Sequence, residues 1–387
     1  MAFDSGTVSF RRYAVMGRSP REPSEKMLQT LEGMSFAPGG SGASQEVEYG
    51  WSGGRHVLDT SFSFEHNVFG EALHFALRVD TNRVPAQIRR AYQIIEDEAA
   101  SLGNAAGKKG VKHAVQRRIE ADLRSGRYRR SRLMPVLWDL PRAMVYAAVS
   151  PAAQEYLLNL FERTFELRLE PLSAGRLALR RMEAAGNRRS YEDAHPTRFA
   201  GGPDGEERAP EYPWVPRGDY PRDWLGNEFL VWLWHHTETE GGVVATGRGE
   251  LGVVIDELLE MHCAFGETGR DVFRASGPTR MPEAVDALFS GKVPRRIGLI
   301  VESGGSQWQL TLSAESFACA GVRLPPAEQA VSPRAVFEQR IDALRDLCET
   351  IDALYEAFLK VRFAGAWDAH VAAVRRWIAR AARRQGA

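Results

Sequence analysis

The sequence predicts a mixed α/β fold (α+β rather than strictly alternating), in which helices and strands follow one another along the chain. Apolar and polar residues alternate at positions 73–80, 297–301 and 308–312, which is typical of half-buried strands. Apolar residues at helical spacing in positions 336–358 predict a long amphipathic helix. The length of 387 residues leaves room for two or three units, each with its own core.

Strands and helices are predicted to alternate through the first half of the chain. A short strand at positions 9–15 precedes a helix that includes Met27 and Leu31. In the strand at 73–80, His74 is expected to point outward. Pro85 suits the first turn of the next helix, which should end by Gly103. Strands at 134–139 and 143–148, a helix after Ser150 and a strand at 167–172 complete this part.

The second half begins with a change in composition. Positions 186–226 are rich in Gly, Pro, Asp and Arg, which indicates a linker or a long insertion. We expect the aromatic stretch 229–234 to be buried, positions 253–261 to be helical, and a short helix at 283–289 to end near Gly291. The glycines at 304 and 305 then form the turn of a hairpin.

These observations divide the chain into four parts. Residues 1–175 form an N-terminal α/β unit with a basic helical arm at about 84–132. Residues 176–228 hold a basic patch and the Gly/Pro-rich segment, and residues 229–330 form a second α/β unit with the hairpin. Residues 331–387 contain C-terminal helices and a basic tail with arginines at 375, 376, 380, 383 and 384.

The most polarised segment is KKGVKHAVQRRIEADLRSGRYRRSR, at positions 108–132. It holds ten lysines and arginines against two acidic residues. Val111, Val115, Ile119 and Leu123 recur every four residues, so the segment reads as an amphipathic helix with a basic outer face. Such a face either keeps the protein soluble or binds a polyanion. The candidate residues for binding a polyanion are Lys108, Lys109, Lys112, Arg117, Arg118, Arg124, Arg127, Arg129, Arg130 and Arg132.

Charge and cysteine content restrict the protein class. Fifty basic and fifty acidic residues balance, with an acidic excess at 204–267, so charge is segregated along the chain. The three cysteines, Cys263, Cys319 and Cys348, have no CxxC spacing and predict neither a disulfide framework nor a zinc ribbon. The N-terminal residues lack the pattern of a secretory signal, and no apolar run is long enough to span a membrane. We expect a cytoplasmic protein.

Several short motifs, in their order, resemble the family of the recombination-associated protein RdgC. They are LEGMSFAP at 31–38 with YGW at 49–51, RVPAQIRR at 83–90, VLWD at 136–139, LEPLS at 169–173 and AVDALFSGKV at 284–293, followed by the hairpin. The resemblance touches half to two thirds of the chain. The segment 186–226 and the tail after Phe363 have no counterpart in the family pattern.

The resemblance implies a horseshoe-shaped subunit that closes with a second copy into a ring dimer around double-stranded DNA. It also implies modulation of recombination through restraint of a RecA-type recombinase, a location on the nucleoid, and no enzymatic activity, cofactor or metal. Single-stranded DNA is a second possible ligand. Lys108, Lys109 and Lys112 match the family's lysine-rich helix, and Lys292 matches its Gly-Lys-Val motif.

Two other functions are compatible with the residues. His235, His236 and the neighbouring Glu238 and Glu240 could hold a metal for phosphodiester hydrolysis, as could a looser group at 257–263, although neither has a standard zinc spacing. Alternatively, the basic segments could hold an acidic protein in an assembly scaffold. A phosphate-binding loop is not indicated, because GRGELG at 247–252 does not follow a convincing strand.

Overall fold

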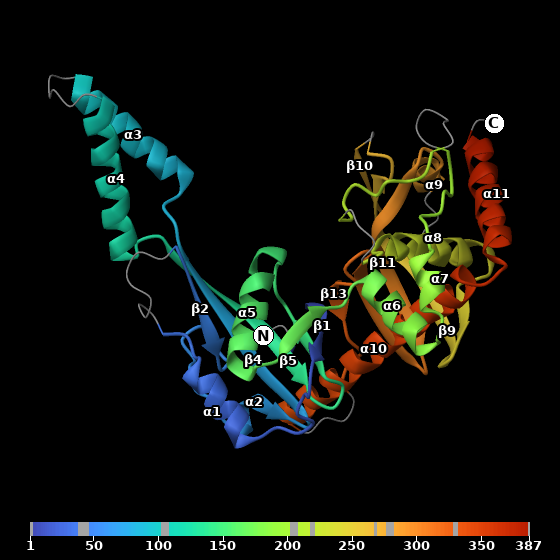
Figure 1. Cartoon of the computed structure of the whole chain (residues 1–387), viewed down its shortest axis with the longest axis horizontal. Helices are drawn as coiled ribbons and strands as arrows, with labels where there is room; N and C mark the ends of the chain where they lie inside the picture. The colour runs from blue at the N-terminus through green and yellow to red at the C-terminus, as the bar shows by residue number, and fades with distance from the viewer. Residues whose placement is uncertain are drawn as a thin grey trace. The chain divides into compact units, whose positions relative to one another are not determined.

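The computed structural model describes residues 3–37, 46–101, 108–201, 208–216, 221–266, 269–275, 282–327 and 332–385 (Figure 1). It is a mixed α/β structure, 43% helical and 28% strand, built on open antiparallel sheets, as the sequence predicts. The chain forms two compact units. The smaller unit is residues 15–169, and the larger unit combines residues 1–14 with 170–387. Strands β1 (Val8–Met16) and β7 (Arg168–Pro171) carry the chain from one unit into the other.

The smaller unit is built on a sheet with the order β6-β5-β4-β2. These strands are β2 (Val47–Ser52), β4 (Ala72–Asn82), β5 (Arg129–Asp139) and β6 (Met144–Ala147), and the short β3 (Val68–Phe69) pairs with β4. β4 and β5 pair along their full lengths, from Ala72 opposite Asp139 to Asn82 opposite Arg129. The strands at 9–15, 134–139 and 143–148 are confirmed.

Aromatic side chains fill the space between this sheet and helix α5 (Gln154–Phe165), which follows the 3-10 turn η1 (Pro151–Ala153). The Trp138 ring lies 5.0 Å from that of Phe161, edge to face. Trp51 donates its indole N–H to Thr164 Oγ1 at 2.8 Å, so its polar atom is satisfied inside the core. Helix α1 (Glu25–Gly33) buries Leu28 and Leu31 in the same unit, which confirms the predicted helix.

The expectation that His74 points into solvent is wrong. His74 is only 6% exposed, and β4 is buried on both faces. The loop between β2 and β4 covers the second face, where Arg78 donates to the Val57 carbonyl at 2.8 Å. Period-two alternation predicts a strand, but it cannot show that a distant loop covers the polar side of that strand.

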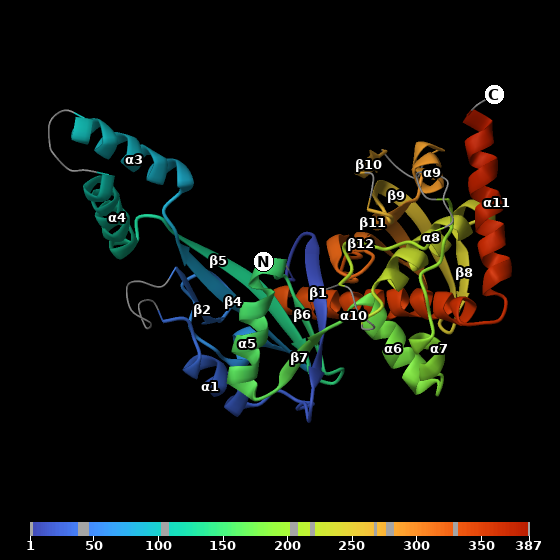
Figure 2. The same ribbon diagram turned by 45° about the horizontal axis from the view of Figure 1, so that its top comes forward.

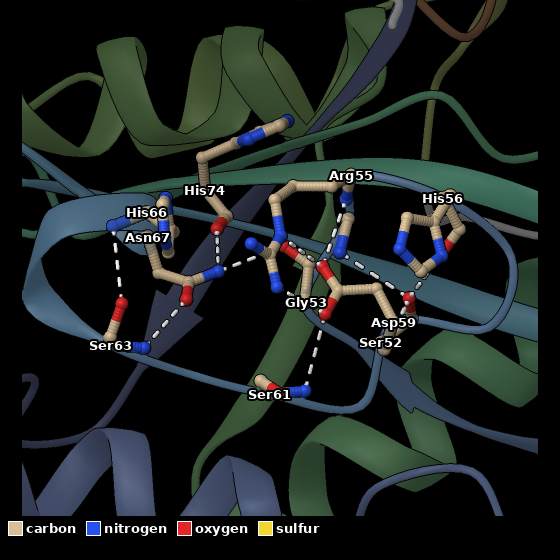
Figure 3. Close-up of polar contacts among 11 residues, drawn as sticks. Ser52, Gly53, Arg55, His56, Asp59, Ser61, Ser63, His66, Asn67 and His74 are labelled. Atoms are coloured by element: carbon tan, nitrogen blue, oxygen red, sulfur yellow. Dashed lines mark hydrogen bonds and ion pairs between the residues drawn. The ribbon is translucent and has the colours of Figure 1, made fainter.

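That loop is held together by a polar network (Figure 3). The Asp59 carboxylate accepts hydrogen bonds from the Arg55 guanidinium, at 2.9 Å, and from the Ser61 backbone N–H. Asn67, at the end of α2 (Phe64–Asn67), donates to the carbonyls of Gly53 and His74. These polar groups satisfy one another within the fold-back, and we assign the network to stabilising the loop.

The larger unit has a second antiparallel sheet, with the order β10-β9-β11-β12-β13 and the first residues of β1. Its strands are β8 (Val243–Thr246), which pairs with β9, then β9 (Gly249–Cys263), β10 (Arg270–Arg274), β11 (Lys292–Ser303), β12 (Ser306–Ser313) and β13 (Cys319–Arg323). The predicted hairpin is confirmed, with Ser303 opposite Ser306. GRGELG does follow a strand, β8, but it leads into another strand and not into a helix.

Positions 253–261, predicted to be helical, lie in strand β9 instead. The pairing with β11 explains the error. Ile297 faces Leu259 while Leu299 faces Ile255, so two steps along β11 match four steps along β9. Glu257, with φ of +56°, lies in this bulge. The bulge puts the apolar side chains of Ile255 and Leu259 four residues apart, which imitates the spacing of a helix.

Helices of the larger unit pack against this sheet and against one another (Figure 2). Phe229 of α8 (Trp224–Thr239) packs against Phe317 and against Tyr355 and Phe358 of α10 (Pro333–Arg362). The buried aromatic stretch and the long amphipathic helix are confirmed. α11 (Trp367–Gln385) places Val374 and Ile378 in the core; the side chains of Arg383 and Arg384 lie outside the described part. α9 (Pro282–Phe289) is the short helix predicted before Gly291.

The described parts of segment 186–226 are packed and do not form a free linker. α6 (Ala174–Ala184) and α7 (Arg188–Glu192) precede and open it. Tyr191, Phe199 and Tyr212 are each buried, with at most 4% of their surface exposed. Residues 202–207 and 217–220 of this segment lie outside the described residues.

Candidate nucleic-acid interface

The most basic segment forms one half of a helical hairpin, which we call the arm. It consists of α3 (Ala86–Ser101) and α4 (Lys108–Ser125), which extend away from the sheet of the smaller unit in both views (Figures 1 and 2). α3 follows β4 and α4 precedes β5, so the arm connects two paired strands. Val111 and Val115 are buried between the helices, as their spacing predicts.

Polar contacts fix the two helices of the arm to one another. The Tyr92 hydroxyl donates to the Asp122 carboxylate at 2.5 Å. This hydrogen bond raises the pKa of Tyr92 to about 12, because it stabilises the protonated phenol that donates to the carboxylate. Arg118 forms an ion pair with Glu96 of α3 at 2.8 Å. The apolar side of α3 is covered less than its sequence suggests, since Ile94 and Ile95 are 49% and 45% exposed.

All ten candidate cations between positions 108 and 132 are exposed. They fall into two groups, one on α4 and one at the start of β5, which are continuous through the turn at Arg127. The α4 group is Lys108, Lys109, Lys112, Arg117, Arg118 and Arg124, and the β5 group is Arg129, Arg130 and Arg132.

Some of this charge is compensated within the unit. Besides the pair of Arg118 with Glu96, Arg129 lies 3.1 Å from Glu48 and Arg127 lies 3.9 Å from Asp122. The carboxylates of these pairs are only 8–18% exposed, so these three arginines have less charge to offer to a polyanion than the unpaired cations.

Arg124 has no carboxylate partner in the described ranges, but its guanidinium donates to the Glu120 carbonyl at 3.3 Å. The other six cations make neither an ion pair nor a hydrogen bond through their charged groups with any described residue: Lys108, Lys109, Lys112, Arg117, Arg130 and Arg132. Their charge is therefore available to a ligand.

The eleventh candidate, Lys292, is placed differently. It begins β11 in the larger unit, its side chain is 14% exposed, and its ammonium group lies 2.5 Å from Asp271. A lysine held in this way has less charge to offer to a ligand than the exposed lysines of α4.

The structure adds basic residues that the sequence analysis did not select. Arg83, Arg89 and Arg90 lie at the start of the arm and are all exposed. Arg83 pairs with Glu46 at 2.8 Å. All three belong to the RVPAQIRR motif. Arg89 and Arg90 lie in the first turns of α3, which leaves the sheet close to Arg130, and this position could have identified them.

Arg83, Arg89 and Arg130 line a groove at the base of the arm. The groove has a volume of about 620 Å³, and its walls come from the end of β4, the start of α3, the C-terminal part of α4 and the start of β5. Tyr128 and Glu46 also line it, together with Val84, Ile119 and Leu123. Its lining therefore combines three arginines and one glutamate with apolar side chains and one tyrosine.

The histidine cluster proposed for a metal is separated by packing. On α8, the His235 ring lies edge to face against His370 and Trp377 of α11. His236 hydrogen-bonds the Val243 carbonyl through Nε2 at 2.8 Å, and its Nδ1 lies 3.3 Å from Glu240, so the structure brings together only these two of the four residues. In the looser group, Glu260 faces His262 and Arg270 at 3.2 Å each. Across the part of the chain that the structure describes, no three His, Cys, Asp or Glu side chains are grouped so that they could hold a metal ion.

Comparison with known proteins assigns no family to this chain. The chain matches no family model and no curated protein sequence. Of the helices in the described residues, none has the combination of length and apolar character needed to cross a membrane.

Proposed function

We propose that this protein binds DNA through the arm and the first residues of β5, without regard to sequence and without altering the DNA chemically. The observation that carries the proposal is the set of six exposed cations that have no ion pair with a described carboxylate, all within 25 residues of one another. Such a set attracts a polyanion and gains free energy by releasing its counterions.

The arrangement favours contact with phosphates over contact with bases. The cations are distributed along a helix and a strand and are carried on long side chains. Reading bases requires side chains that are held rigidly against a groove edge, such as a bidentate arginine on guanine. Phosphate contacts fix position on the duplex but carry no sequence information.

The resemblance to the RdgC family supports a more specific form of this proposal. In that form the protein is a homodimer that encircles double-stranded DNA on the nucleoid and restrains a RecA-type recombinase. A twofold assembly would bring two arms to one duplex, so that each phosphate backbone meets basic residues from both copies.

Neutralising the arm tests the DNA-binding proposal. Replacing Lys109, Lys112 and Arg117 together with glutamine should weaken binding to unrelated duplexes equally. It should also lower the slope of log affinity against log salt by roughly 0.9 for each phosphate that the variant no longer neutralises. Fluorescence anisotropy at several salt concentrations measures both effects.

A matched control comes from the second basic patch, on α6 and α7. Replacing Arg181, Arg188 and Arg189 with glutamine removes the same number of charges from positions that are 50%, 57% and 91% exposed. This control should bind DNA like the unmodified protein. If both triple variants lose affinity equally, the arm has no special role and the proposal fails.

Further measurements separate the alternatives. Duplex DNA incubated with the protein and Mg²⁺ or Mn²⁺ should be shifted but intact, whereas cleavage would favour a metal-dependent hydrolase. No binding at all would leave the scaffold function. Light scattering should give twice the chain mass of 43.1 kDa without DNA, and that mass plus the mass of one duplex with DNA; a single copy of the chain in both states would exclude the ring. Inhibition of strand exchange by a purified recombinase would test the regulatory role.

A further inference from the structure

The groove at the base of the arm differs from the rest of the basic surface, because its lining combines cations with apolar side chains and a tyrosine. Arg89 and Arg130 line it, and neither forms an ion pair with a carboxylate in the described ranges. Val84, at 6% exposure, contributes to the apolar wall. A surface that only attracts phosphates needs no such apolar lining.

Neighbouring residues hold the ring of Tyr128, which lines the groove. Its hydroxyl is hydrogen-bonded to Tyr92, whose own hydroxyl donates to Asp122 of α4. The Arg127 guanidinium lies 5.8 Å from the centre of the Tyr128 ring. A ring fixed by two helices loses little conformational freedom when a flat ligand stacks on it.

From these observations we propose that the groove binds one nucleotide whose base is unpaired. The phosphate would lie against Arg89 and Arg130, and the base would stack on the Tyr128 ring. The volume of about 620 Å³ falls within the range of about 300–1,000 Å³ that is typical of small-ligand sites.

A base inside a duplex cannot enter this groove, because both of its faces are covered by its neighbours in the stack. Entry therefore requires a single strand, a frayed end or an extruded base. Glu46 also lines the groove, paired with Arg83, and its negative charge keeps the phosphate toward Arg89 and Arg130. The groove would thus let the protein distinguish single-stranded DNA from intact duplex, which the cations of α4 cannot do.

This inference rests on the proposed DNA-binding function, and Tyr128 provides the test. Tyr128→Leu removes the ring but keeps an apolar side chain, whereas Tyr128→Phe keeps the ring and removes only the hydroxyl. Binding is measured by anisotropy with a labelled oligothymidine, with covalently closed circular duplex as competitor. Circular dichroism and thermal melting compare the folding of both variants with that of the unmodified protein.

Tyr128→Leu should weaken binding to oligothymidine by roughly 5- to 150-fold, the range expected for loss of one stacked base. It should leave affinity for closed duplex unchanged, and Tyr128→Phe should retain most affinity for both. The triple variant of Lys109, Lys112 and Arg117 should lose affinity for both. As a direct readout, oligonucleotides with 5-iodouracil should cross-link to the peptide containing Tyr128.

The outcomes separate the two proposals. If Tyr128→Leu weakens both ligands equally or neither, or if cross-links form only elsewhere, the nucleotide site is wrong while DNA binding through the arm stands. If the unmodified protein binds neither ligand, the proposed function fails and the nucleotide site fails with it.

Discussion

Replacing His235 with phenylalanine should make the free energy of unfolding less sensitive to mild acid. His235 lies on α8 and is 6% exposed, and its Nδ1 atom has no hydrogen-bond partner among the described residues. Burial, and then the neighbouring His370, lower its pKa from 6.5 to about 4. Glu240 acts in the opposite direction and His236 in the same direction, but both effects are smaller.

The sign follows from the proton uptake of the two states. As pH falls below 6.5 the unfolded chain protonates this histidine, whereas the folded protein does so only near pH 4. Stability from this group is therefore complete above pH 6.5 and decreases as the pH falls. The decrease is about 2 kcal/mol at pH 5 and about 3 kcal/mol at pH 4, from the pKa values of 6.5 and about 4.

Urea unfolding near neutral pH and at about pH 5 measures this difference. The unmodified protein should lose about 2 kcal/mol more than His235→Phe between the two conditions. Hydrogen exchange of the α8 and α11 amides, corrected for intrinsic rates, shows whether the loss is local to the contact of His235 with His370. The exposed His66 supplies a control, since His66→Gln should keep the full pH dependence. An equal loss in His235→Phe and the unmodified protein would refute the reasoning.

Two further predictions concern stability and can be measured by thermal or urea unfolding. Arg362→Met should cost about 3–5 kcal/mol, because it leaves the fully buried Glu228 carboxylate without its partner at 2.6 Å; adding Glu228→Gln should recover part of the loss. Gly226→Ala should destabilise the protein severely, because an added Cβ would lie 1.9 Å from the Ala314 carbonyl oxygen. Gly247→Ala, where the Cβ meets nothing within 4 Å, should unfold like the unmodified protein, and equal melting of the two glycine variants would contradict this account.

The elements that could be predicted are those whose apolar residues follow a single period. The hairpin of β11 and β12, the long α10 and the helix that became α4 each bury one face, so their spacing records the structure directly. β9 could not be predicted, because the bulge at Glu257 interrupts the alternating row of buried residues and leaves a gap of four positions between Ile255 and Leu259.

The candidate site was predictable only in its local part. The cations at positions 108–132 are neighbours in sequence, so their density was visible without a structure. The groove depends on long-range pairing, since Thr81 faces Arg130 across β4 and β5 and thereby brings Arg89 and Tyr128 to the same cavity. The pairing of Arg118 with Glu96 depends in the same way on how α3 returns against α4.

The way the arm is attached makes it a replaceable part of the molecule. β4 and β5 keep their register up to Asn82 and Arg129, which face each other at the point where the arm begins and ends. A two-residue Asn-Gly turn is the ordinary connection for such a pair of strand ends. A chain shortened in this way would keep every pairing of the sheet while losing both helices. The same two strand ends could then carry a helical hairpin of different charge, which would change the charged surface of the protein without redesign of its core.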